Sequence, residues 1–378
     1  MHFRLNKTDS QYGYDELKKK VRLEDAIKTL DGRGSAIGDI SQFVTFLKAA
    51  SLWYARLYGQ QHDDLDKSLV EVLDQIRGQD RQASIMPMML ALLIKNEGKG
   101  HAMAHLLKLL EVLNFRVYMA RNITARNDTG QGELYDLASS YYHGVLLDYF
   151  GEESRIVGHV TLANDEEALE YSLVRFVLQY APDTLFAESF KLELGSADDF
   201  FDWRGLRYFL MSYEQHLQPN KTILIDKITR SRNEGRSADY LSLEHLWATE
   251  NRNRPGENDR VVDKFEKRRL GNFVLLELRL NIQGYSDNLE DKLPRYLDGD
   301  GDEPATDLQQ VRNIAKNIRR FVKDNQNRSR SKNYYLDLHR AINELQEHDY
   351  VKFALKRWSV EPYLGYKKIL KEMGEETE

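Results

Sequence analysis

Strand-like sequence is confined to one stretch of this chain, residues 241–296, while most of the remainder has the periodicity of helices. Two short apolar runs lie in this stretch. The first, LSL, ends in Glu244 and His245, and the second, 273–276, begins directly after Asn272. Each run is short and apolar and fits a strand better than a helix. The sequence therefore predicts a mainly α fold, with these strands as its exception.

Polar residues follow the two runs in a fixed order. They are an acidic residue and a histidine, then an asparagine, a second asparagine and a lysine: Glu244, His245, Asn272, Asn281 and Lys292. This order resembles the His-Asn-His/Asn (HNH) nuclease motif. The resemblance implies a ββα-metal module, in which two strands and a helix fold around one divalent ion, embedded in a helical scaffold. It also implies cleavage of a nucleic-acid backbone.

The residue types suit phosphodiester hydrolysis. A neutral histidine can take a proton from water near pH 7, which fits His245. Mg²⁺ or Mn²⁺ prefers oxygen ligands and keeps several waters, so Glu244 and Asn281 could suffice to hold it. Neighbouring strand residues point to opposite faces, so Glu244 and His245 can reach one ion only where the strand ends or bends.

Two further residues complete the predicted catalytic set of His245, Asn272, Asn281 and Lys292. Asn272 is placed to hydrogen-bond backbone across the loop and to hold the histidine's strand in register. Lys292 follows on a helix and could contact phosphate as a point charge.

The same stretch is similar to the nuclease half of the GmrSD-type type IV restriction proteins, which restrict modified phage DNA. That family reads Glu-His-Ile-x-Pro and later Leu-Gly-Asn-Leu-x-Leu-Leu. Here Glu244-His245-Leu246 and LGNFVLL at 270–276 match, and the upstream helix at 200–210 also resembles the family. The resemblance implies a metal-dependent DNA endonuclease or nickase of antiphage defence.

Two departures from the family leave alternatives open. The proline after the histidine is absent, since the chain reads His245-Leu246-Trp247-Ala248. No Asp-Gly-Gln-Gln-Arg motif of the ParB-like, nucleotide-hydrolysing half occurs either. The chain is then expected to be a separate nuclease subunit, or the C-terminal portion of a longer chain, working with such a partner. The alternatives are a non-catalytic DNA-binding or partner-binding subunit with the same fold, and a purely helical interaction protein.

The 378 residues are long enough for two or three domains. The pattern predicts an N-terminal arm at 1–39, a helical scaffold domain at 40–195, the nuclease domain at 196–302 and a C-terminal helical segment at 303–378. Cysteine is absent, and the longest apolar run, 83–94, is far shorter than the roughly 20 residues of a membrane span. With no signal peptide at the start, these features predict a cytoplasmic protein with no membrane partner.

The net charge of −6 does not suit a DNA-binding protein on average, but local clusters matter more. Acidic residues interleave with the basic ones in the loop before Arg268, whereas the run 325–333 is purely basic and polar. Double-stranded DNA is the predicted partner. The predicted DNA-binding residues are Arg268, Arg269, Arg328, Arg330 and Lys332. His101 and His105, spaced for zinc on a helix, have no third ligand nearby and are interpreted as surface residues.

Overall fold

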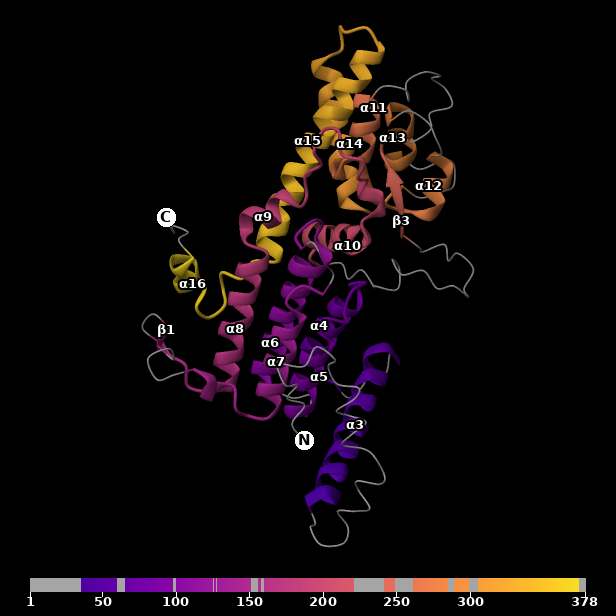
Figure 1. Cartoon of the computed structure of the whole chain (residues 1–378). Coiled ribbons are helices and arrows are strands. Elements are labelled where there is room, and N and C mark those ends of the chain that lie inside the picture. Colours follow the sequence, from indigo (N-terminus) through magenta and orange to yellow (C-terminus); the bar gives the residue numbers. More distant parts are fainter. Residues whose placement is uncertain are drawn as a thin grey trace.

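The computed structural model describes residues 35–59, 65–97, 100–124, 126, 128–150, 156–157, 160–220, 241–248, 261–284, 289–298 and 305–373. Most of these residues are helical, which confirms the predicted mainly α fold (Figure 1). Among the described residues, no helix is both long and apolar enough to cross a membrane.

The N-terminal half is a bundle of helices. Its elements are α3 (Ser35–Gly59), α4 (Lys67–Arg77), α5 (Met86–Lys95), α6 (His101–Leu113), α7 (Gln131–Tyr142), α8 (Asp165–Tyr180) and α9 (Asp183–Glu188). Proline sets two of the boundaries, because Pro87 lies in the first turn of α5 and Pro182 separates α8 from α9. Helix α6 continues into a π-helical turn, η1 (Asn114–Met119), whose side chains are all buried. The centre of the bundle around the end of α6 therefore buries Glu111, Asn114 and Arg116 among apolar side chains.

The C-terminal half surrounds the strand pair. It contains the short helix η4 (Phe200–Asp202), α10 (Leu206–Leu217), α11 (Val261–Arg268), η6 (Leu270–Asn272), α12 (Leu278–Gly284), α13 (Leu289–Asp298), α14 (Gln309–Asp324), α15 (Lys332–Arg357) and α16 (Tyr366–Glu372). The sequence pattern predicted two helices, 335–347 and 350–357, where the structure has the single helix α15. That prediction was wrong because His348 and Asp349 interrupt the apolar pattern without breaking the backbone, which contains no Gly or Pro there.

The described residues form two small antiparallel sheets. Strand β3 (Leu241–His245) pairs with β4 (Phe273–Glu277), at the two apolar runs of the sequence. Strands β1 (Ile156–Val157) and β2 (Val160–Thr161) form a second pair, so the prediction that strands occur only in the 241–296 stretch was wrong. Strands of two residues are too short to give an alternating sequence pattern.

Helix α15 connects the strand pair to the helical bundle. Near its middle, the Gln346 side chain donates to the Gly271 carbonyl beside β4. At its C-terminal end, the Trp358 ring stacks on Phe115 of η1 with centroids 3.6 Å apart. Buried apolar residues from both halves form one continuous core. The predicted segment 303–378 thus packs against both of the units proposed at 40–195 and 196–302, and those boundaries remain predictions.

Candidate active site at the end of strand β3

The register of the strand pair fixes which residues share a face. His245 is opposite Phe273, and Glu244 is opposite Val274. Because strand side chains alternate, His245 lies on one face with Leu243 and Phe273, whereas Glu244 lies on the other. The sheet continues from β4 directly into α12, so the described order is strand, strand, helix. The loop between the strands includes 249–260, which lies outside the described residues.

The His245 imidazole lies in an aromatic surround. Its ring centroid is 4.7 Å from that of Phe273 and 5.1 Å from that of Phe201 in η4. Burial, together with the positive charges of Lys292 and Lys267, lowers the pKa of His245 to about 4. The ring is therefore neutral near pH 7. Neither ring nitrogen hydrogen-bonds to another part of the described chain, so both are available to water or substrate.

Asn272 fixes the backbone immediately after His245. Its carbonyl accepts from the Leu246 N–H at 2.9 Å, and its side-chain Oδ1 accepts from the Trp247 N–H at 2.7 Å. Its Nδ2 donates to the carbonyls of Trp247 and Lys267 at 3.1 and 2.8 Å. Asn272 is only 1% exposed. The backbone after β3 is thus held by one buried amide side chain, which hydrogen-bonds both to Trp247 and to Lys267 at the end of α11.

Glu244 occupies the opposite face of the sheet, in a buried ion pair. Lys292 Nζ lies 2.6 Å from Glu244 Oε1 and also donates to the His245 carbonyl at 3.0 Å. The Tyr296 hydroxyl donates to the same Oε1 at 2.7 Å. Burial raises the pKa of Glu244, and the neighbouring Lys292 charge opposes that rise. Lys292 and Tyr296 therefore tie α13 to the end of β3.

Asn281 connects α12 to the same strand. Its Nδ2 donates to Ser242 Oγ at 2.8 Å and to the Leu243 carbonyl at 2.9 Å. The structure thus brings Asn281 and Lys292 to β3, and Asn272 to the loop that follows it. Each one bonds the backbone next to Glu244 or His245.

The predicted ion ligands do not fit a directly bound Mg²⁺ in this arrangement. Glu244 is 4% exposed, and the Lys292 ammonium lies where a cation would have to bind its oxygen. Asn281 is engaged with the strand backbone. Within the described part of the chain, no group of three or more His, Asp or Glu side chains could hold a metal. A requirement for Mg²⁺ or Mn²⁺ therefore rests on the resemblance alone.

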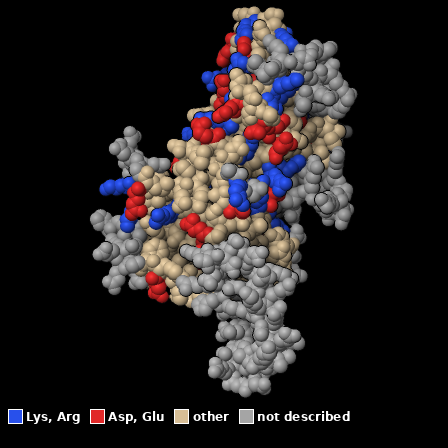
Figure 2. All heavy atoms as spheres, in the orientation of Figure 1, with Lys and Arg blue, Asp and Glu red and all other residues tan. Residues whose placement is uncertain are grey.

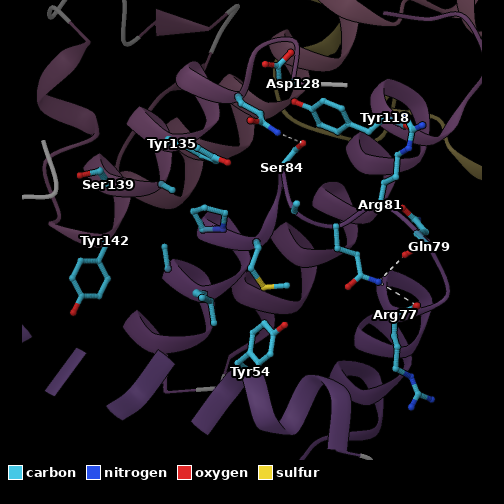
Figure 3. Close-up of a pocket in the computed structure, with 18 of the residues that line it drawn as sticks. Tyr54, Arg77, Gln79, Arg81, Ser84, Tyr118, Asp128, Tyr135, Ser139 and Tyr142 are labelled. Carbon is cyan, nitrogen blue, oxygen red and sulfur yellow. Dashed lines mark hydrogen bonds between the residues drawn. The ribbon is translucent and has the colours of Figure 1, made fainter. Parts of the chain in front are cut away.

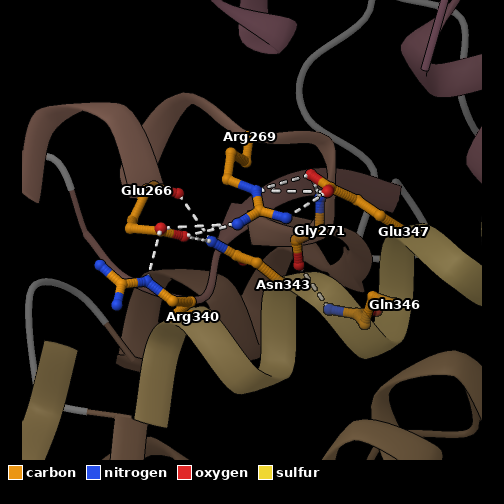
Figure 4. A network of polar contacts seen from close by, with 7 residues as sticks. All are labelled: Glu266, Arg269, Gly271, Arg340, Asn343, Gln346 and Glu347. Carbon is orange, nitrogen blue, oxygen red and sulfur yellow. Dashed lines mark hydrogen bonds and ion pairs between the residues drawn. The ribbon is translucent and has the colours of Figure 1, made fainter. Parts of the chain in front are cut away.

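Arg269, one of the predicted DNA-binding residues, lies in an interior network (Figure 4). Its guanidinium forms ion pairs with Glu266 at 3.1 Å and with Glu347 of α15. Its side chain is 13% exposed. A Cβ atom on the adjacent Gly271 would lie 2.5 Å from backbone atoms of Asn343, so only glycine allows this approach of η6 to α15. The structure assigns Arg269 to this helix contact rather than to an exposed basic surface.

The other predicted DNA-binding residues are accessible to different degrees. Arg328, Arg330 and Lys332 are exposed at the turn between α14 and α15, at one end of the molecule (Figure 1). Arg328 pairs with Asp337 at 2.7 Å, and the Arg330 guanidinium lies 4.3 Å from the Tyr334 ring centroid. Arg268 is half-buried and near Asp199, which precedes η4; burial raises the pKa of that carboxyl, and the Arg268 charge opposes the rise. Arg268 is thus the member of the set near the element that covers His245.

Three residues around His245 were not among the site residues predicted from the sequence: Phe201, Lys267 and Trp247. Phe201, 48% exposed, contacts the imidazole from η4. Lys267 is buried, acts on the His245 pKa and lies 5.1 Å from the Trp247 ring centroid. Trp247 in turn stacks on His339 of α15. The sequence analysis placed Lys267 in the charged loop between the two apolar runs, where the structure has helix α11, whereas no local signal connects Phe201 to a histidine 44 positions later.

Two cavities in the described structure lie away from this site. A cavity of about 1140 Å³ lies in the helical bundle between α3, α5 and α7, where Tyr54, Tyr118, Tyr135 and Tyr142 line it (Figure 3). A polar cavity of about 430 Å³ lies beside η4, lined by Asp199 and Asp202 among others. None of the predicted site residues lines either cavity. His245 is partly buried and lies outside both cavities.

Comparisons with models of protein families, with curated proteins and with solved structures found no significant match.

Proposed function

We propose that this chain hydrolyses phosphodiester bonds in DNA, with His245 as the general base. The observation that supports this most is His245 itself. Its imidazole is neutral near pH 7, its ring nitrogens are available, and it ends the first strand of a strand-strand-helix arrangement. A neutral imidazole at this position can accept a proton from a water that attacks phosphorus.

The charges around His245 suit an anionic substrate. Burial is the main cause of the lowered pKa of the imidazole, and the charges of Lys292 and Lys267 lower it further. Lys292 is paired with Glu244, so in this proposal Lys267 is the cation that attracts a phosphate and stabilises the negative charge that builds on its oxygens as water attacks. Asn272 keeps the backbone after His245 fixed and so limits movement of the base. In this proposal Asn272, Asn281 and Lys292 are positioning residues, because each one bonds backbone next to His245 or Glu244.

The proposed biological setting follows the family resemblance. The chain acts in the cytoplasm as the nuclease part of a restriction system against phage DNA. A nucleotide-hydrolysing, ParB-like partner supplies the recognition of modified DNA. Mg²⁺ or Mn²⁺ belongs to this proposal through the resemblance and is tested separately.

The experiment is a nicking assay with purified chain, supercoiled plasmid and Mg²⁺. The expected result is conversion to open-circular DNA, with a free phosphate at one end of the break. The exposed His348 side chain has no hydrogen bond, ion pair or ring contact with any residue that the structure describes, so His348→Ala serves as the control for any histidine variant. Absence of nicking with Mg²⁺ and with Mn²⁺ would reject the proposal for the isolated chain.

One observation favours a second candidate, a DNA-binding or partner-binding subunit without catalysis. Glu244 and Lys292 neutralise one another in the interior, so the predicted ion ligands are not offered to solvent. This candidate predicts DNA binding that is the same in wild type and His245→Ala, with no cleavage by either.

A further inference from the structure

Helix α14 carries positive charge along one face. The cations are Arg312, Lys316, Arg319, Arg320 and Lys323, and all five are exposed. At 3.6 residues per turn these positions fall within an arc of roughly 100° around the helix axis. The opposite side is apolar and buried, through Val311, Ile314, Ala315 and Ile318. We call the five cations the α14 ridge.

The ridge has one sign of charge. The first turn of α14 contains no acidic residue, and the helix sequence has none before Asp324 at its end. Lys316, Arg319, Arg320 and Lys323 form no ion pair with any residue that the structure describes. The face drawn in Figure 2 carries both signs of charge intermingled. Among the described residues, no carboxylate therefore pairs with these four ridge charges.

The position of the ridge is fixed relative to the candidate active site. The Gln310 side chain accepts from the Leu275 N–H of β4 at 3.1 Å. Buried Glu214 of α10 accepts from the N–H groups of Gln309 and Gln310 at 2.6 and 2.9 Å, which caps the N-terminus of α14. The helix is thus bonded directly to the strand that pairs with β3. A polymer held on the ridge would have a defined position relative to His245.

The geometry of the ridge suits a regularly charged polymer. Four of its cations recur every three or four residues, which corresponds to about 5–6 Å along the axis at 1.5 Å per residue. Nucleic-acid backbones present closely spaced phosphates, and Lys and Arg bind them without reading sequence. An anionic membrane is the other common partner of a basic helix, but such a helix inserts an apolar face. The apolar face of α14 is already buried, and no large exposed hydrophobic residue lies in 305–332.

We infer that the α14 ridge binds the phosphate backbone of nucleic acid. The inference rests on the proposed function, since it assigns the surface that would hold the DNA cut at His245. The ridge continues into the turn that contains the exposed Arg328, Arg330 and Lys332. Binding along it is expected to be independent of sequence, because phosphate contacts carry little base information.

The test compares two triple variants with equal loss of charge. The ridge variant is Lys316→Gln, Arg319→Gln and Lys323→Gln. The control is Lys352→Gln, Lys356→Gln and Lys367→Gln, which removes three exposed lysines outside the ridge. Affinity for a short fluorescein-labelled DNA duplex is measured by anisotropy in EDTA at several salt concentrations, and melting temperatures confirm that both variants are folded.

The ridge variant is expected to reduce the magnitude of the slope of log affinity against log salt concentration by about 2–3, at about 0.9 for each lost phosphate contact. It is also expected to weaken binding by at least roughly tenfold near 0.1 M salt. The control is expected to change the slope by less than about 1. Equal behaviour of the two variants would overturn the inference. Ridge-dependent binding to phosphatidylserine vesicles with unchanged DNA binding would overturn it in favour of a membrane.

Failure of this inference and failure of the proposed function give different results. If nicking depends on His245 but not on the ridge, the inference about the ridge is rejected and the proposed function stands. Ridge-dependent DNA binding without nicking by any variant rejects the catalytic proposal alone.

Discussion

Lys292 Nζ lies 2.6 Å from Glu244 Oε1, and the two residues are 0% and 4% exposed. This contact gives Glu244 a partner inside the protein, on the face of β3 opposite to His245. It makes Glu244 a structural residue in this arrangement. It also connects α13 to the end of the strand that carries the proposed base.

A test of this contact separates a structural role for Glu244 from a role as ion ligand. Glu244→Gln leaves the Lys292 charge buried without its partner, and breaking such a pair typically costs about 3–5 kcal/mol. The melting temperature in EDTA should therefore fall. Lys292→Met in the Glu244→Gln background should recover part of the loss. An unchanged melting temperature in EDTA would contradict a structural role for this ion pair.

Activity itself should depend on a divalent ion, as the resemblance implies. EDTA is expected to stop nicking, and Mg²⁺ or Mn²⁺ should restore it, since no thiolate exists in the chain to favour zinc. Nicking at full rate in EDTA, measured after removal of bound metal, would contradict this expectation.

Asn272→Ala should destabilise the protein by about 2–4 kcal/mol. The substitution leaves the buried Trp247 N–H and the Lys267 carbonyl without partners, and each unsatisfied group costs about 1–3 kcal/mol. Asn272→Asp keeps the acceptor for Trp247 but places a buried carboxylate oxygen against the carbonyls of Trp247 and Lys267, so it should lose at least as much stability. Chemical denaturation followed by circular dichroism measures both variants. Wild-type stability of either variant would show that the Asn272 side chain does not hold this backbone.

The stability of the protein should fall as the pH is lowered from about 6.5 to 4. In the unfolded chain His245 takes up a proton near its usual pKa, whereas in the folded protein its pKa is lowered to about 4. The stability from the neutral imidazole is thus fully present above about pH 6.5 and is lost by about pH 4, to the extent of roughly 2–3 kcal/mol. His245→Gln should remove this part of the pH dependence. His348→Gln, at an exposed position, should leave it unchanged.

The isolated chain should nick modified and unmodified plasmid similarly, with or without ATP or GTP. Its sequence contains no ParB-like motif or nucleotide-binding loop, so recognition and nucleotide control are assigned to the partner. Strong stimulation of the isolated chain by a nucleotide, or clear preference for modified DNA, would contradict this division of roles.

Local sequence patterns predicted much of this fold. The strands β3 and β4 were evident because apolar runs of this length fit strands better than helices. The spacing of the α14 ridge is also present in the sequence, since Arg312, Lys316, Arg319 and Lys323 recur every three or four residues. The predicted DNA-binding residues nevertheless came from the neighbouring turn at 325–333 and not from this helix. Pairing between distant residues was not readable. Glu347 is 78 positions from Arg269, and nothing near Arg269 in the sequence shows that its charge is neutralised inside.

The most direct test of the central claim is the single-turnover rate of DNA nicking by His245→Ala, measured beside His348→Ala at pH 7 with Mg²⁺. Loss of a general base typically lowers the rate by about 10²–10⁴. We predict a loss of this size for His245→Ala with DNA affinity unchanged, and a wild-type rate for His348→Ala. Nicking by His245→Ala at the rate of His348→Ala would contradict the assignment of His245 as the base.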